Sequence, residues 1–190
     1  MGQAALKQQV QSTPTPGVYQ IDTAHSSIGF VARHLMVAKA RGRFDEFSGS
    51  VQVGATAEES SVDVTIDAGS IQTGQAGRDE HLRSADFLNV AAFPTLRYRS
   101  TSATQTGPST LRIEGELTIR DITRPVTLDA RFEGTVVDPW GNDRIAFSAR
   151  AEIDRYDFGV TWNQALETGG VVVGPKVKIE IDVALVKPQA

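Results

Sequence analysis

The chain has 190 residues, of which 40% are hydrophobic and 22% are charged, a composition typical of one globular domain with a sizeable core. Its 19 Lys and Arg against 23 Asp and Glu give a net charge of −4, which argues against a nucleic-acid-binding protein. Cysteine is absent, which excludes disulfides and cysteine zinc sites, and no apolar run approaches the ~18 residues of a membrane helix.

Residues 1–16 are rich in Gln, Thr and Pro and lack the apolar stretch that an export signal carries. We expect a disordered lead over 1–16, followed by a single domain over 17–190. A cytoplasmic protein is the simplest expectation from this segment.

From Val18 onward, apolar and polar residues alternate with a period of two. This alternation is typical of antiparallel strands with one face toward water. It predicts eight strands, at about 18–35, 40–53, 62–68, 94–104, 111–119, 126–136, 145–153 and 177–185. Eight sequential antiparallel strands most often close into a barrel, because closure removes the exposed edge strands.

One short helix interrupts the strands near 78–88, where His81, Leu82, Ala85 and Leu88 recur at helical spacing. Asp79 can cap this helix. Residues 156–174 are aromatic and then Gly-rich, so we expect a long loop over one barrel end.

Several positions on the predicted inner face are small: Gly115, Ala130, Gly134, Ala149 and Ala151. An eight-stranded barrel is just wide enough to be filled by side chains or to hold one small ligand. The small residues therefore predict either a long apolar cavity or space for large partners opposite, such as Phe132 and Phe147. Strands of about ten residues would enclose a lumen about 25 Å long, a shape that suits a chain lipid.

Five segments, in the same order along 18–186, resemble motifs of the YceI-like, lipocalin-like family. They are Asp22–Phe30 with Arg33-His34-Leu35, Gly42–Gly49, Arg78–Phe87 with Phe93-Pro94-Thr95, Leu117–Val126, and Asp154–Gly159. The resemblance implies a lipocalin-like antiparallel β-barrel with a helix near one end. It further implies binding of an amphiphile, typically a polyisoprenoid or isoprenoid quinone, with the tail inside the barrel, and a possible homodimer.

Three residues depart from the family pattern. Asp121 stands where a turn glycine is usual, which Asp tolerates if that residue is left-handed. Asp154 and Tyr156 replace the more usual Asn and Ser in the last motif.

Charged residues of these motifs allow two interpretations. Arg78, Arg83 and Arg155 could bind an anionic head group, but acidic residues beside them favour structural ion pairs with Asp79, Asp86 or Asp157. The three histidines, His25, His34 and His81, show no close metal-binding spacing, and we expect no metal and no cofactor.

The favoured hypothesis is a non-enzymatic protein that sequesters or transports a long-chain isoprenoid, of the polyprenyl phosphate or isoprenoid quinone type, in its lumen. One alternative is an isomerase or hydrolase that uses His34 or His81; another is a filled barrel whose outer face binds proteins. The residues predicted to contact the ligand are Phe30, His34, Phe47, Arg78, His81, Phe87, Phe93, Tyr98, Gly115, Phe132, Gly134, Phe147, Ala149 and Trp162.

Overall fold

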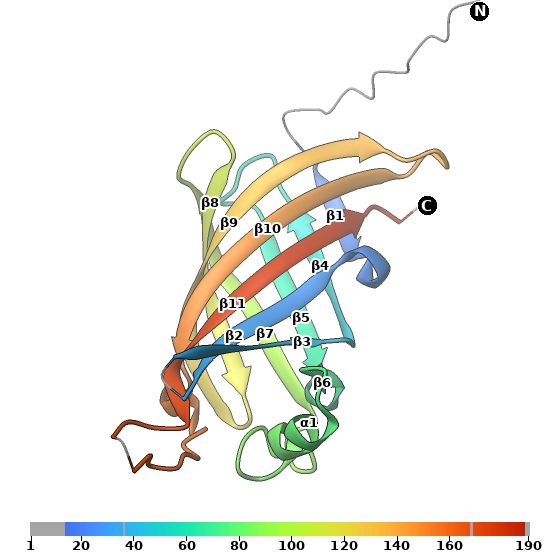
Figure 1. Cartoon of the computed structure of the whole chain (residues 1–190). Helices are drawn as coiled ribbons and strands as arrows, with labels where there is room; N and C mark the ends of the chain where they lie inside the picture. Colours follow the sequence, from blue (N-terminus) through green and yellow to red (C-terminus); the bar gives the residue numbers. More distant parts are fainter. Residues whose placement is uncertain (1–13, 36, 168, 189–190) are drawn as a thin grey trace, which may run out of the picture.

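The computed structural model describes residues 14–35, 37–167 and 169–188, and its strands form one continuous antiparallel sheet (Figure 1). The strands are β1 Gly17–Ile21, β2 Ser27–His34, β3 Ala38–Phe44, β4 Phe47–Val53, β5 Ser61–Asp67, β6 Ile71–Gln72, β7 Thr95–Gln105, β8 Thr110–Ile119, β9 Ile122–Val137, β10 Asp143–Asp154 and β11 Val173–Val186. Most of the predicted lead, residues 1–13, lies outside the described residues.

The sheet closes into a barrel through its last strand. Strands run in the order β1-β4-β5-β7-β8-β9-β10-β11, and β11 returns to β1 through the pairs Leu185–Ile21 and Val186–Gln20. The other half of β11 pairs with β2, which continues the sheet to β3 and β6. The prediction of an eight-stranded antiparallel barrel is confirmed.

The two long strands predicted at 18–35 and 40–53 are each broken in the structure. A 3-10 turn, Thr23–His25, separates β1 from β2, because the Asp22 carboxylate accepts a hydrogen bond from the Ala24 amide. Beside this turn, the Ser26 hydroxyl accepts from the Ala184 amide and donates to the Asp22 carbonyl. The Ser26 hydroxyl thus takes the place of a backbone acceptor for the Ala184 amide of β11. On either side of this break, β1 pairs with β4 and β2 pairs with β3.

The helix, α1, spans Ala76–Arg83 rather than 78–88, so the predicted end is wrong by five residues. Asp79 does not cap it: the carboxylate is buried in the first turn and accepts from the amide and hydroxyl of Thr73. The helix ends at Ser84, whose hydroxyl and amide both donate to the His81 carbonyl. Turns then carry the chain to β7.

Two connections cover the same end of the barrel, called here the lower end, as drawn in Figure 1. One is α1 with the turns over 84–94; the other is a 3-10 turn, Arg155–Phe158, with the loop that follows it to β11. The predicted long loop over one barrel end is thus present, apart from residue 168, which is not described. The opposite, upper end carries the β4–β5 loop over 54–60 and the β7–β8 loop over 106–109.

A bulge between β9 and β10 reverses the predicted orientation of Gly134. Phe147 pairs with Phe132, but the next residue back, Ala146, pairs with Gly134, so Glu133 is an extra residue in β9. Paired residues share a face of the sheet, and Ala146 faces outward because Phe147 faces the lumen. Gly134 therefore lies on the outer face, contrary to the prediction that it lines the lumen.

Gly134 has φ +141°, a backbone conformation that side chains rarely adopt. We expect Gly134→Ala to lower the free energy of unfolding by about 1–3 kcal/mol, measured by urea unfolding. Gly77 is the matched control, because a Cβ there meets nothing within 4 Å and the residue lies in α1. Gly77→Ala should stabilise by about 0.5–1 kcal/mol; equal effects at both positions would contradict the assignment of strain to the bulge.

Candidate functional site

The barrel encloses two adjoining apolar cavities. The upper cavity has a volume of about 260 Å³ and the lower cavity about 200 Å³. Leu128 on β9 and Ile181 on β11 line both, so the two spaces meet near the middle of the barrel. These volumes exclude the interpretation in which side chains fill the interior completely.

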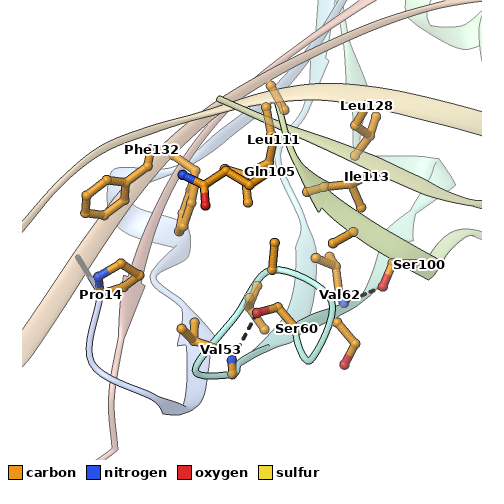
Figure 2. A pocket seen from close by; sticks show the side chains of 18 of the residues that line it. Pro14, Val53, Ser60, Val62, Ser100, Gln105, Leu111, Ile113, Leu128 and Phe132 are labelled. Carbon is orange, nitrogen blue, oxygen red and sulfur yellow. Dashed lines mark hydrogen bonds between the residues drawn. The ribbon is translucent and has the colours of Figure 1, made fainter. Parts of the chain in front are cut away.

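The upper cavity reaches the upper end of the barrel, where its wall changes from apolar to polar (Figure 2). Its inner wall is formed by inward-facing residues of eight strands, among them Val53, Val62, Leu111, Ile113, Ala130, Phe132, Phe147, Ala149, Val183 and Leu185. Its rim is formed by the β4–β5 loop, the β7–β8 loop and Pro14, with Gln105 at the end of β7. This polar end of the lumen is called here the upper mouth.

The lower cavity lies behind α1 and the Arg155–Phe158 turn. Leu82, Phe87, Phe158 and Val160 from these connections close it below. The wall above them is almost entirely aliphatic and aromatic, with Tyr98 and Arg155 as its polar residues. Such a space accepts hydrocarbon, because a polar group placed in it would lose its hydration without a partner.

Tyr98 occupies the volume that the absent side chain of Gly115 leaves. A Cβ on Gly115 would lie 2.6 Å from the Tyr98 hydroxyl oxygen and the ring carbon that bears it. The hydroxyl lies 3.1 Å from the Ile113 carbonyl and 3.3 Å from the Val126 carbonyl. Burial raises the pKa of Tyr98 to about 12, and the charge of Glu114 adds to the effect. Gly115 thus makes room for the Tyr98 side chain and lines neither cavity. The prediction that Gly115 contributes open space to the lumen is not met.

The three arginines singled out from the sequence are structural, but the predicted acidic partners are wrong. Arg155 is 5% exposed and donates from Nε to the Gly174 carbonyl and from Nη1 to the Val160 and Trp162 carbonyls. Its Nη2 donates to the Val173 carbonyl and the Tyr156 hydroxyl. Burial lowers the pKa of Arg155, whose charge is held by neutral carbonyl oxygens.

Arg78 and Arg83 fasten α1 to the segment before it. Arg78 donates to the hydroxyl and carbonyl oxygens of Thr73. Arg83 donates to the carbonyls of Gly69 and Ile71, both at 2.7 Å. Neither forms an ion pair among the described residues, and neither lines a cavity.

His81 belongs to an aromatic cluster at the lower end. Its ring packs edge-on against Phe87 and Trp162, with centroid distances of 5.0 and 4.7 Å, and Nε2 lies 2.8 Å from the Asp86 carboxylate. Of these residues only Phe87 lines the lower cavity. His34, at the end of β2, lines neither cavity. In the part of the chain that the structure describes, no three His, Asp or Glu residues gather as metal ligands.

The predicted ligand contacts divide by position. Six line a cavity: Phe30, Phe87 and Tyr98 the lower one, and Phe132, Phe147 and Ala149 the upper one. Eight do not: His34, Phe47, Arg78, His81, Phe93, Gly115, Gly134 and Trp162. Phe47 packs in the core, and the Arg120 guanidinium lies over the Phe93 ring. Contact with a ligand remains a prediction for the six.

Gln105 of the upper cavity was not among the site residues predicted from the sequence. Leu96, Tyr98 and Ser100 face the lumen, but a bulge at Thr101 shifts the inward set to Ala103 and Gln105. Strict alternation from Tyr98 would place Ala103 and Gln105 on the outer face, so period alone could not have found them.

Comparison with known proteins agrees with this barrel. The family model described as YceI-like domain matches residues 19–185. The chain belongs to the YceI-like family. A UPF0312 protein of Shewanella denitrificans is 41% identical over 145 residues, covering 75% of this chain and 76% of that protein.

Two solved structures share the YceI-like barrel. BcnA of Burkholderia cenocepacia superposes with a TM-score of 0.76 at 22% identity, covering 86% of this chain and 98% of BcnA. A polyisoprenoid binding domain from Saccharophagus degradans gives a TM-score of 0.63 at 15% identity, covering 90% and 98% of the two chains. At these identities the likeness concerns the fold.

The positions at which this YceI-like chain departs from the family pattern keep their structural roles. The Asp154 carboxylate accepts from the Tyr156 amide and so caps the 3-10 turn. The Tyr156 ring lies 4.6 Å from the Arg155 guanidinium carbon. In the β8–β9 turn the left-handed residue is Arg120, with φ +59°, and not Asp121. No helix among the described residues has the length and hydropathy needed to cross a membrane.

Tyr98→Phe should make stability less sensitive to alkaline pH. Folding raises the Tyr98 pKa from its ordinary value of 10.0 to about 12, so it favours the neutral phenol. That contribution is complete below pH 10 and is lost as the pH rises through 12. We expect Tyr98→Phe to cost about 0.5–1.5 kcal/mol at neutral pH and progressively less between pH 10 and 12, measured by urea unfolding. A cost that is constant over this range would show that the hydroxyl is not buried as described.

Proposed function

We propose that this protein binds an isoprenoid amphiphile and carries or sequesters it, with the hydrocarbon tail inside the barrel and the head group at the upper mouth. The observation that carries the proposal is the pair of adjoining apolar cavities, which have a polar rim at the upper end and lie against α1 and the Arg155–Phe158 turn at the lower end. The structural likeness to a polyisoprenoid binding domain supports the isoprenoid class.

The size of the lumen suits a short branched chain or the end of a long one. A cavity of about 150 Å³ holds benzene, so on this scale the two cavities together hold roughly 18 carbons, or three to four isoprene units. A longer tail requires that the lumen widen or that the chain extend through the mouth. Tail burial contributes about 1.5 kcal/mol per isoprene unit, while one head contact contributes about 0.5–1.5 kcal/mol. The tail therefore sets affinity and the head sets orientation.

The enzymatic alternative lacks a positioned catalytic group. It required His34 or His81 beside a bound amphiphile, but neither residue lines a described cavity, and His81 is engaged by Asp86, Phe87 and Trp162. Binding without turnover is the function that the geometry supports better. The cytoplasmic location and the homodimer remain predictions.

Extraction of the purified protein tests the ligand class directly. The protein is prepared without detergent and extracted into organic solvent, and the extract is analysed by mass spectrometry. We expect a prenol, prenyl phosphate or isoprenoid quinone in stoichiometric amount. A stoichiometric straight-chain fatty acid would retain the lipid cavity and contradict the isoprenoid assignment.

A larger side chain at Ala149 tests whether the tail lies in the lumen. Ala149 is buried and lines the upper cavity, so Ala149→Phe fills this space. We expect at least a tenfold loss of affinity for a prenol, measured by displacement of a neutral fluorescent dye. Arg150→Phe is the matched control, because Arg150 is the next residue on β10 and its side chain faces water.

The control variant should bind as the wild type does, and far-ultraviolet circular dichroism should show that both variants fold. Unchanged affinity in a folded Ala149→Phe variant would place the tail elsewhere.

A further inference from the structure

We propose that the upper mouth selects an uncharged head group, such as a prenol hydroxyl or a quinone carbonyl, over a phosphate. This inference rests on the proposed function, since it concerns the head group of the amphiphile whose tail occupies the lumen. The sequence leaves open a polyprenyl phosphate and an isoprenoid quinone, and this inference favours the quinone.

The polar groups that face the upper mouth are hydroxyls and an amide. Gln105 points its amide group into the cavity (Figure 2), and its Nε2 donates to the Gly107 carbonyl at 2.9 Å, which holds the side chain at the rim. The rim is also lined by Thr56, Ser60 and Ser109. Neutral donors and acceptors of this kind pair well with a hydroxyl or carbonyl oxygen.

Ser100 gives the inner wall below the rim one further donor. Its hydroxyl oxygen accepts from the Val62 amide at 2.8 Å, one residue beyond the last β5–β7 pair, Asp63–Arg99 (Figure 2). The hydroxyl proton is left to donate into the cavity. A carbonyl oxygen that enters the mouth can therefore find a donor at this depth.

The charge held at the rim is negative. The Glu59 carboxylate accepts from the amide of Ala55, a rim residue, at 3.0 Å. Gly54 makes this approach possible, since a Cβ there would lie 2.3 Å from the Glu59 Cβ. Glu58 adds a second acidic residue to the same loop. A phosphate in the mouth would lose hydration and face this charge.

The cationic side chains near the lumen that the structure describes are engaged elsewhere. Arg131 pairs with Thr110 across the sheet, but it lies on the outer face and forms an ion pair with Glu133. Lys187 donates to the Pro16 carbonyl. At the other end, Arg155 lines the lower cavity with all its N–H groups donated to the five oxygens named above, so it offers no donor to a phosphate.

The test compares two ligands that share a tail of three isoprene units and differ in the head: the prenol and the prenyl monophosphate. Each displaces a neutral fluorescent dye from delipidated full-length protein at about 0.1 M salt. We expect the wild type to bind the prenol at least tenfold more tightly. Gln105→Lys places a cation at the mouth and should reduce this preference at least fivefold.

Thr104→Lys is the matched control. It adds the same charge one residue away, but Thr104 pairs with Arg112 on the outer face of the sheet. We expect it to change the preference less than twofold. Equal shifts in the two lysine variants would assign the effect to net charge and overturn the role of the mouth.

The remaining outcomes separate this inference from the proposed function. If the wild type binds the monophosphate as tightly as the prenol, the head-group inference is wrong while the isoprenoid lumen stands. If neither ligand displaces the dye, the proposed function falls and the head-group inference falls with it.

Discussion

Closure of the sheet through β11 is the constraint on which the rest of this structure depends. A closed sheet has no free edge, so the backbone of the barrel is paired and the side chains alone decide what its interior holds. β11 meets this constraint with three neighbours, pairing with β10 along its length and with β2 and β1 in turn. The break at Thr23–His25 allows that exchange of partners, since Asp22 and Ser26 satisfy the backbone where the ladder is interrupted.

The two ends of the barrel are built for different purposes. At the lower end, long side chains bond to backbone carbonyls: Arg155 joins the turn at 155–158 to β11, and Arg83 joins α1 to the segment at 69–71. A buried cation without a carboxylate is costly to desolvate, and several carbonyl dipoles at hydrogen-bonding distance offset that cost. The upper end instead carries short neutral side chains and two loops around an opening. An apolar lower cavity and a polar upper rim are the arrangement that an amphiphile requires.

The interior shows why a small residue does not by itself indicate a cavity. Gly115 and Ala149 are both buried inward positions, yet the space beside Gly115 is taken by Tyr98, whereas Ala149 borders open volume. The difference depends on a residue of the neighbouring strand, because Tyr98 on β7 lies beside Gly115 on β8. Tyr98 reaches over Gly115 because its hydroxyl finds two carbonyl oxygens there, on β8 and β9. No property of Gly115 itself distinguishes the two cases.

The sequence by itself determined the fold class, the number of strands in the barrel, the family and the apolar character of the lumen. The fold class, the strand number and the apolar lumen follow from the alternation of apolar and polar residues, and the family follows from five motifs in chain order. Both are properties of the sequence that do not depend on how the strands pair. Phe30, Tyr98 and Ala149 line the cavities for the same reason, because they lie on stretches of strand that alternate with a period of two.

Only the tertiary structure decided the rest. The bulges at Thr101 and Glu133 changed which residues face inward, so Gln105 joined the mouth and Gly134 left the lumen. The partners of Arg78 and Arg155 were carbonyls exposed by turns, and not the acidic residues beside them in the chain. The physical reason is the same in each case. A bulge, a turn and a contact between neighbouring strands are set by how the strands pair, and no periodic pattern within one strand records its partner.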